Sequence, residues 1–307
     1  MHVVVAGASG ALGSVLVPQL VAAGHTVTGV SRSPAGLERI RAAGARAVQA
    51  DVLDGPGLLR ALAGTRADAV IHQATAIDRT PTMHRHLHRT DELRDRGTAH
   101  LLRCAEQMGA ARFVTQSFFL GYGYRDHGPA PVTEDRPFGE FAGDAFDVHM
   151  RSMRTNEDQV LGATGIAGIA LRYGLFYGVD RSTAALIDLT RRRRLPVPVP
   201  AGVTSPVHLE DAAAATVAAL ERGRPGQAYN VVDDHPLGFD EFVDAIASAA
   251  RAPRPPRVPA WVLRPLPYLY ALMVRTRIRV SNAKARTELG WTPRYPSCRE
   301  GLAALTG

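Results

Sequence analysis

Near its start the 307-residue chain reads His2-Val-Val-Val-Ala6-Gly7-Ala-Ser-Gly10-Ala-Leu-Gly13. The β-branched run at its beginning predicts a buried strand, and residues 12–23 read as a helix that comes directly after it. Glycines between a strand and a helix permit a tight turn, let backbone N–H groups approach a diphosphate, and place it at a helix N-terminus that favours negative charge. The loop residues predicted to hold such a ligand are Gly7, Ser9, Gly10, Ala11, Leu12 and Gly13.

Short apolar runs alternate with helix-like segments through the first half of the chain. The predicted strands cover residues 2–6, 26–30, 47–48, 69–72, 112–115 and 168–171. The predicted helices cover residues 12–23, 37–43, 57–62 and 90–108, and a further one ends at 157–162. Strands separated by helical crossovers form βαβ units, which build a parallel sheet with helices on both faces. We therefore predict an α/β fold, a Rossmann-type doubly wound parallel sheet.

The pattern loosens after Tyr173. Prolines at 196, 198, 200 and 206 mark a segment that is unsuited to a central strand, and residues 252–259 read as a stiff Pro-rich connector. A helix at 211–220, which we expect Glu210 or Asp211 to cap, and a strand at 228–232 return to the sheet. We predict that residues 1–173 and 207–233 form the dinucleotide-binding domain, and that residues 174–206 and 234–307 form a smaller C-terminal substrate-binding lobe.

The composition is that of a soluble globular protein, with 46% hydrophobic and 21% charged residues. The formal net charge is +7; of the 36 basic residues 35 are Arg, and Lys284 is the only Lys. These residues are spread along the chain rather than clustered, so we do not expect nucleic-acid binding. An anionic cofactor or substrate would use the same positive field.

The remaining composition argues for a cytoplasmic protein. Cys104 and Cys298 lie far apart without metal or redox spacing, which fits a reducing compartment. The chain opens directly on a predicted strand, so we expect no leader peptide. The most apolar stretch, 261–274, is interrupted by Arg264, Pro265 and Pro267. We therefore expect a helix that packs in the lobe and no membrane anchor.

The end of the second predicted strand bears on the choice of cofactor. Sites that prefer NAD place Asp or Glu near this point to hold the ribose 2′-OH. This chain has Ser31, Arg32 and Ser33 instead. An Arg can form a charge-assisted contact with a 2′-phosphate, which favours NADP(H) over NAD(H). The alternative is a solvated surface Arg without that role.

Several further segments resemble the extended short-chain dehydrogenase/reductase family, which is NAD-dependent epimerase/dehydratase-like, in the right order along nearly the whole chain. They include the G-x-x-G-x-x-G loop, Val207-His-Leu-Glu-Asp211 and Leu289-Gly-Trp-Thr-Pro293. The resemblance implies that Asp51 and Val52 flank the adenine, that Gln73, Ala74 and Thr75 lie beside the cofactor ribose, and that Gln116 belongs to the cofactor site. The segment from Leu171 to Gly178 resembles the loop that meets the nicotinamide carboxamide.

The catalytic set that this resemblance implies is missing. The family uses a Tyr as acid/base, a Lys four residues later on the same helix face, and a Ser or Thr. The only Lys is Lys284, and no Tyr lies between Tyr124 and Tyr173. In one alignment register the Tyr becomes His149 and the Lys Met153; in the other they become Met150 and Arg154. Counting back from Gly123 places Phe118 at the catalytic hydroxyl, one residue after Ser117.

Four residues are the candidates to replace this set: Ser117, Tyr122, His149 and Arg154. His149 exchanges protons near neutral pH, and Tyr122 or its neighbour Tyr124 would donate to a carbonyl at the carboxyl edge of the sheet. Arg154 would hold a ribose or phosphate but stays charged and is no base. The histidines of residues 83–88 lack a carboxylate or Cys partner at ligand spacing, so we predict no metal site.

The leading hypothesis is an NADP(H)-dependent reductase, or a related isomerase or dehydratase, that acts on a small-molecule metabolite. Hydride transfer requires mainly positioning, because the cofactor carries the chemistry. One alternative is a non-redox enzyme of the cyclase or isomerase type in the same cleft. Another is a catalytically inactive NADP-binding regulator. A homodimer through the long helices is common in the family that the chain resembles, and nothing in the sequence decides it.

Overall fold

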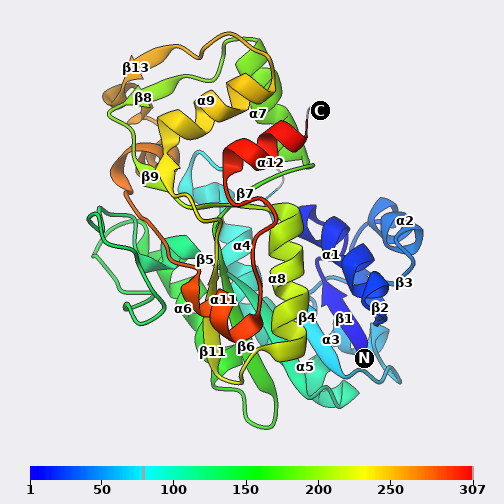
Figure 1. Ribbon diagram of the computed structural model, residues 1–307. Helices are drawn as coiled ribbons and strands as arrows, with labels where there is room; N and C mark the ends of the chain where they lie inside the picture. The colour runs from blue at the N-terminus through cyan, green and yellow to red at the C-terminus, as the bar shows by residue number, and fades with distance from the viewer. Residues whose placement is uncertain (78–79, 306–307) are drawn as a thin grey trace.

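The computed structural model describes residues 1–77 and 80–305 (Figure 1). Its main sheet has seven parallel strands in the order β11-β6-β5-β4-β1-β2-β3. β1 pairs with β2 on one side and with β4 on the other, so the strand order reverses beside β1. This confirms the predicted doubly wound α/β fold. Ligands of such sheets bind in the crevice outside the carboxyl ends of the strands at that reversal.

The elements of the sheet layer agree closely with the predicted alternation. Its strands are β1 (His2–Ala6), β2 (Thr26–Ser31), β3 (Arg46–Gln49), β4 (Ala69–His72), β5 (Arg112–Phe118), β6 (Ala167–Tyr173) and β11 (Gln227–Val231). Its helices are α1 (Ala11–Ala22), α2 (Pro34–Ala42), α3 (Gly55–Ala61), α4 (His88–Glu92), α5 (Thr98–Met108), α6 (Asp147–Leu161), α8 (Leu209–Arg222) and α11 (Ala283–Leu289).

The core lies on both faces of this sheet. Side chains of a strand alternate between faces, so Val3 and Val5 pack with residues of α1 and α8, while Val4 and Ala6 pack with α3 and α5. Because β1 is buried on both sides, its near-continuous apolar run is what a central parallel strand requires. Residues 285–291, which the sequence predicts for the lobe, pack in the core on the α8 face. The predicted domain boundaries stay a prediction.

The predicted helix at 90–108 is not uniform. α4 and α5 are joined by a π-helical turn, Leu93–Gly97. The His72 ring Nε2 lies 3.1 Å from the Leu93 carbonyl oxygen, and this bond ties the start of the wide turn to the end of β4. Helical periodicity in the sequence does not reveal such a turn, because it depends on a tertiary contact.

A second layer of elements forms the lobe. Its helices are α7 (Arg181–Arg191), α9 (Phe239–Ala249), α10 (Pro267–Tyr270) and α12 (Cys298–Ala304). Its strands are β7 (Leu175–Tyr177), β8 (Val197–Val199), β9 (Val203–Thr204), β10 (Pro206–His208), β12 (Leu237–Gly238) and β13 (Arg257–Pro259). Figure 1 shows α7, α9 and α12 grouped at one end of the main sheet.

Two details, one in the lobe and one at the start of α8, differ from the sequence prediction. The Pro-rich connector at 252–259 contributes β13, which pairs with β8 as a two-stranded sheet whose open edges accommodate Pro198. The cap of α8 is His208, whose Nδ1 accepts from the Glu210 N–H, instead of Glu210 or Asp211. Asp211 instead accepts backbone N–H groups of the C-terminal segment at 2.7 and 3.0 Å. Among the described residues, no helix has both the length and the apolar character needed to cross a bilayer.

Candidate functional site

The loop after β1 has the geometry that diphosphate binding requires. Gly7 adopts φ +85°, and a Cβ there would lie 2.5 Å from the Gln73 carbonyl carbon, so only glycine fits. A Cβ on Gly13 would lie 2.2 Å from the Gly7 oxygen, which explains how α1 starts so close to the loop. α1 has no side-chain cap at Gly10. Its first N–H groups are therefore free for an anion.

The end of β2 places the predicted 2′-phosphate contact at the edge of a cavity. The Arg32 side chain is 53% exposed, and its Nη1 lies 3.8 Å from Asp51 Oδ2. Asp51 also pairs with Arg89 at 3.3 Å. Ser33 caps α2 by accepting from the Gly36 N–H. The carboxylate of Asp51 thus orients the Arg32 guanidinium without burying it, and the guanidinium stays accessible to a ligand.

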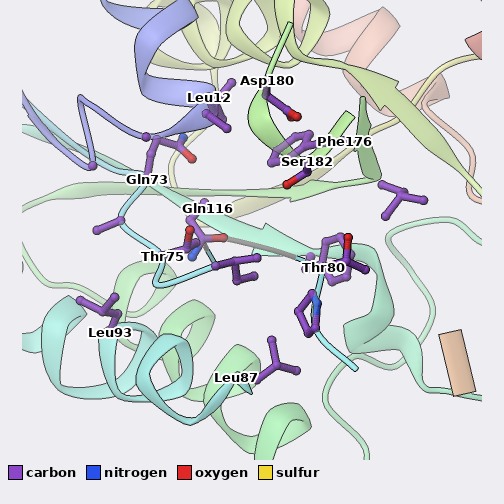
Figure 2. Close-up of a pocket in the computed structure, with 18 of the residues that line it drawn as sticks. Leu12, Gln73, Thr75, Thr80, Leu87, Leu93, Gln116, Phe176, Asp180 and Ser182 are labelled. Carbon is purple, nitrogen blue, oxygen red and sulfur yellow. The ribbon is translucent and has the colours of Figure 1, made fainter. Parts of the chain in front are cut away.

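One continuous cavity of about 710 Å³ joins this loop to the lobe. Of the fourteen residues predicted to bind the cofactor, all but Gly13 line it. Figure 2 shows Leu12, Gln73 and Gln116 around one part of the cavity, and Thr80, Leu87 and Phe176 around another. These residues fit a dinucleotide. The glycine loop offers amides for a diphosphate, Arg32 offers an exposed guanidinium for an additional phosphate, and the ends of β4 and β5 continue the wall of the cavity beyond them.

The end of β5 contributes polar atoms without partners. The Gln116 Nε2 and the Ser117 Oγ are both buried and make no hydrogen bond to any described residue, and both residues line the cavity. Below them Asn156 of α6 donates to the Gln116 carbonyl at 2.8 Å and fixes the strand end. Buried polar atoms in a protein almost always have a partner. These two atoms therefore indicate where a ligand supplies one.

The structure brings only one of the four catalytic candidates to the cavity. Ser117 lines it, whereas Tyr122, His149 and Arg154 do not. Arg154 lies on the surface of α6 and pairs with Asp158 at 3.5 Å. Arg154 is therefore not at the cavity, where the sequence suggested that it would hold a ribose or a phosphate.

Tyr122 belongs to a buried network beneath the site. Its hydroxyl donates to Asn230 and accepts from Arg172, each at 2.8 Å, and Arg172 pairs with Glu157 of α6 at 2.7 Å. Burial raises the pKa of Tyr122 to about 12. The hydroxyl is committed to these partners, so Tyr122 ties β11 to β6, while Arg172 ties β6 to α6.

His149 is fully buried in a chain of polar side chains. Its Nδ1 lies 2.7 Å from Asp91 Oδ2, and its Nε2 lies 3.0 Å from His84 Nδ1. Burial, and next the neighbouring His149, lower the pKa of His84. The histidines at 83–88 thus include one that continues this chain. Among the described residues no three His, Cys, Asp or Glu side chains are grouped as metal ligands.

Several residues that line the cavity are absent from the set predicted to form the site. Arg94 and Tyr268 line the cavity and are buried among the described residues, and so does Tyr124, which the sequence offered as the alternative to Tyr122. Burial raises the pKa of both tyrosines, and their hydroxyls hydrogen-bond to each other. No signal in the sequence marks Arg94. It lies with Asp91 on the buried stripe of 87, 90, 91, 94 and 98, but four of these five residues are polar, so periodicity does not reveal that this face is buried.

The lobe side of the cavity is mostly apolar. Its aliphatic and aromatic wall is made by Leu186, Leu195, Phe239, Phe242, Val243, Ile246, Leu272 and Met273. These residues come from α7 and the loop after it, from α9 and from the segment after α10, which lie far apart in the sequence. A wall of this kind suits a largely apolar small molecule, which would meet Ser117, Tyr124 and Arg94 at the sheet.

The comparisons with known proteins agree with this architecture. The model of the NAD dependent epimerase/dehydratase family matches residues 3–232. A 3-diazoavenalumate denitrifying reductase from Streptomyces sp is 36% identical over 312 residues, which is 98% of this chain and 99% of that protein. A 4-hydroxy-2-methyl-3-oxo-4-farnesyl-3,4-dihydroquinoline-1-oxide ketoreductase from Stigmatella aurantiaca is 25% identical, over 99% of this chain and 96% of that protein.

Solved structures are similar in fold. A UDP-glucose 4-epimerase from Thermotoga maritima, solved with UDP-glucose, superimposes with a TM-score of 0.82 at 20% identity, covering 100% of this chain and 97% of that one. At this identity the likeness concerns the fold alone.

Proposed function

The chain belongs to the NAD dependent epimerase/dehydratase family, and from that membership we propose that it is an NADP(H)-dependent reductase of a small, largely apolar metabolite. The observation that carries the proposal is the single cavity that runs from the glycine loop to the apolar wall of the lobe. Such a cavity holds a dinucleotide and a second molecule in contact. The names of the two reductase relatives support the same class of reaction.

Three groups of this chain would hold the cofactor. The amides of the loop from Gly7 to Leu12 would bind the diphosphate, and Arg32 would bind a 2′-phosphate. Gln116 Nε2, which has no partner, would donate to the nicotinamide half. A bound nicotinamide supplies the hydride, and the protein's contribution is to orient it toward the lobe and to exclude water.

The substrate would be held between β5 and the lobe. The Ser117 hydroxyl and the neutral Tyr124 hydroxyl both line this part of the cavity and would donate hydrogen bonds to a substrate oxygen or nitrogen. Met153 stands where one alignment register would have the Lys, and it is fully buried and carries no charge. The site therefore lacks the pair that lowers the pKa of a catalytic Tyr in the family that the chain resembles.

This lack favours hydride acceptors that need little help from an acid. When a ketone is reduced, hydride adds to carbon and the oxygen must take up a proton. When an aryl diazonium cation is reduced, hydride replaces dinitrogen on carbon and no proton is consumed. The names of the two relatives cite a diazo compound and a ketone. We place aryl diazonium compounds first among the substrates to be tested, and aryl ketones second.

The test is turnover with both classes of acceptor. Purified protein is first titrated with NADPH and NADH by calorimetry, and NADPH oxidation is then measured with each acceptor, with products identified by mass spectrometry. A Gly10→Val variant is the control, because its side chain would project into the diphosphate site. A Cβ at Gly10 makes one tight contact, with the Gly7 oxygen at 3.3 Å, so thermal unfolding of the variant is measured alongside. We expect the variant to oxidise no NADPH.

The outcomes separate the alternatives. Product without any change in cofactor oxidation state would support a non-redox enzyme, and tight NADPH binding without turnover of any acceptor would support a regulator. Absence of heat with either nucleotide would refute the cofactor assignment itself.

A further inference from the structure

Arg94 is a buried cation without a hydrogen-bond partner in the part of the chain that the structure describes. It is 5% exposed and lies in the π-helical turn Leu93–Gly97, on the wall of the cavity. Its Nε has no hydrogen bond, and among the described residues its one ion pair is with Asp91, at 3.8 Å. An Arg carries five N–H donors in a planar fork, and a buried guanidinium with unfilled donors is costly. The side chain is therefore poised for a partner that the protein does not supply.

Asp91 is occupied by other donors. Its Oδ2 lies 2.7 Å from the His149 ring, and its Oδ1 accepts from the Ser152 hydroxyl at 2.7 Å. Both oxygens thus make short hydrogen bonds to α6, while the distance of 3.8 Å to Arg94 exceeds that of a hydrogen bond. Asp91 lowers the energetic penalty of burying Arg94 but leaves its donors open.

The surroundings of Arg94 define what it would bind. Tyr124 and Tyr268 lie near it on the cavity wall, and the apolar side chains of the lobe face them. The other charged residue on the lobe side, among those described, is Asp180, which is only partly buried and caps α7 by accepting from the Thr183 N–H at 2.6 Å. Among the described residues, the lobe side thus offers one buried positive charge in a space that is otherwise mostly apolar and aromatic.

We propose that Arg94 binds the carboxylate of the substrate, and that the substrate is a carboxylic acid with a flat aromatic or unsaturated body. A single planar guanidinium matches a carboxylate, which it binds through two parallel N–H bonds. A phosphate carries more charge and would require further cations or free amides, which the described residues do not offer on this side. The inference deepens the proposed reductase function by naming its substrate class.

The experiment compares carboxylates with their primary amides. Benzoate, cinnamate and 2-naphthoate, and the three amides, are titrated by calorimetry into protein saturated with NADP⁺. The variants are Arg94→Met, which keeps the length of the side chain without its charge, and Arg94→Lys, which keeps the charge without the fork. Arg96→Met is the matched control, because Arg96 lies in the same turn but is exposed and does not line the cavity.

We expect wild-type protein to bind at least one carboxylate more tightly than its amide. Arg94→Met should weaken carboxylate binding at least about tenfold, as for a lost charge-assisted bidentate contact. The carboxylate affinity of Arg94→Lys should lie between those of the wild type and Arg94→Met, and the carboxylate affinity of Arg96→Met should equal that of the wild type. Amide and NADP⁺ binding should change less than about twofold in every variant. If Arg94→Met does not fold, the carboxylate and amide affinities of Arg94→Lys decide the test, because that variant retains a cation beside Asp91.

Three results would overturn the proposal. They are equal binding of every carboxylate and its amide by wild-type protein, equal weakening of both by Arg94→Met, and a loss of NADP⁺ affinity in that variant, which would assign Arg94 to the cofactor. Each of these results leaves NADPH binding by wild-type protein in place. They are therefore distinguishable from a failure of the reductase proposal, which shows in the nucleotide titration or in turnover.

Discussion

The imidazole of His149 in α6 lies 2.7 Å from the carboxylate of Asp91 in α4, and both side chains are buried. A carboxylate accepts only, so Nδ1 of His149 carries a proton and, in the neutral ring, Nε2 is an acceptor for His84 Nδ1–H. This assignment rests on the hydrogen-bond network. The hydrogen bonds from Asp91 through His149 to His84 tie α6 to α4 and to the segment before α4. They also position Asp91 beside Arg94.

This geometry predicts that His149 is a positioning residue. His149→Ala would leave the Asp91 carboxylate buried without its imidazole partner and open a void, so the free energy of unfolding should fall by about 2–4 kcal/mol. NADP(H) affinity should change less than about twofold, because His149 does not line the cavity. Urea denaturation and calorimetry measure the two quantities, and His88→Ala is the control at an exposed neighbour. Unchanged stability together with lost turnover would instead identify His149 as the acid or base.

Two tyrosines two residues apart allow a matched comparison. Tyr124→Phe removes a hydroxyl that lines the cavity, and kcat/KM for a ketone should fall at least about tenfold, the equivalent of one hydrogen bond to the reacting oxygen. Tyr122→Phe removes a hydroxyl that serves Arg172 and Asn230, and should lower the free energy of unfolding by about 1–3 kcal/mol with little change in KM. The opposite pattern in steady-state kinetics and urea denaturation would return Tyr122 to the catalytic set.

The proposed preference for the phosphorylated cofactor depends on Arg32. Arg32→Ala should weaken NADP⁺ binding by about tenfold or more, because a charge-assisted contact with the 2′-phosphate is lost, while NAD⁺ binding stays within about twofold. Arg41→Ala is the matched control, because Arg41 is an exposed residue of α2 that pairs with Glu38 and does not line the cavity. This variant should change neither NADP⁺ affinity nor NAD⁺ affinity. Equal weakening of both nucleotides by Arg32→Ala, measured by calorimetry, would contradict the preference.

The cofactor half of the site could be predicted from the sequence, and most of the other half could not, for a physical reason. The loop from Gly7 to Gly13 and the ends of β2, β4 and β5 are local motifs, because each consists of a strand end and the residues next to it in the chain. Tertiary packing assembles the lobe half instead, from residues such as Tyr268 and Arg94 that lie far apart in the sequence. The tie between His72 and Leu93 that shapes the π-helical turn is likewise a tertiary contact.

The geometry of α6 explains why two residues proposed from the sequence lie elsewhere in the structure. Arg154 and His149 lie on one predicted helix, and the two alignment registers differ by one residue, which rotates a helix by about 100°. The structure turns His149 and Met153 inward and leaves Arg154 in solvent. The residues aligned in either register do not line the cavity, because the end of β5 and the turn that carries Arg94 lie between α6 and the cavity.

His72 makes stability depend on pH. The ring is fully buried at the end of β4; Nε2 donates to the Leu93 carbonyl and Nδ1 accepts from the Ala74 N–H, so both nitrogens are used in the neutral form. Burial lowers the pKa of His72 to about 4 from an ordinary value of 6.5. Because the unfolded chain binds the proton more readily, stability is fully present above pH 6.5 and is lost as pH falls from 6.5 to about 4.

We expect His72 to account for about 3 kcal/mol of lost unfolding free energy across that window. Urea denaturation at a series of pH values measures it, as the difference between wild type and His72→Asn. The variant should be less stable at pH 7, where it loses ring packing, but its stability should fall less steeply below pH 6.5. His235→Asn is the control, because its exposed ring should leave the slope unchanged. Parallel pH profiles for wild type and His72→Asn would show that the folded protein protonates this ring as readily as the unfolded chain does, and would contradict an Nδ1 that is held as the acceptor of the Ala74 N–H.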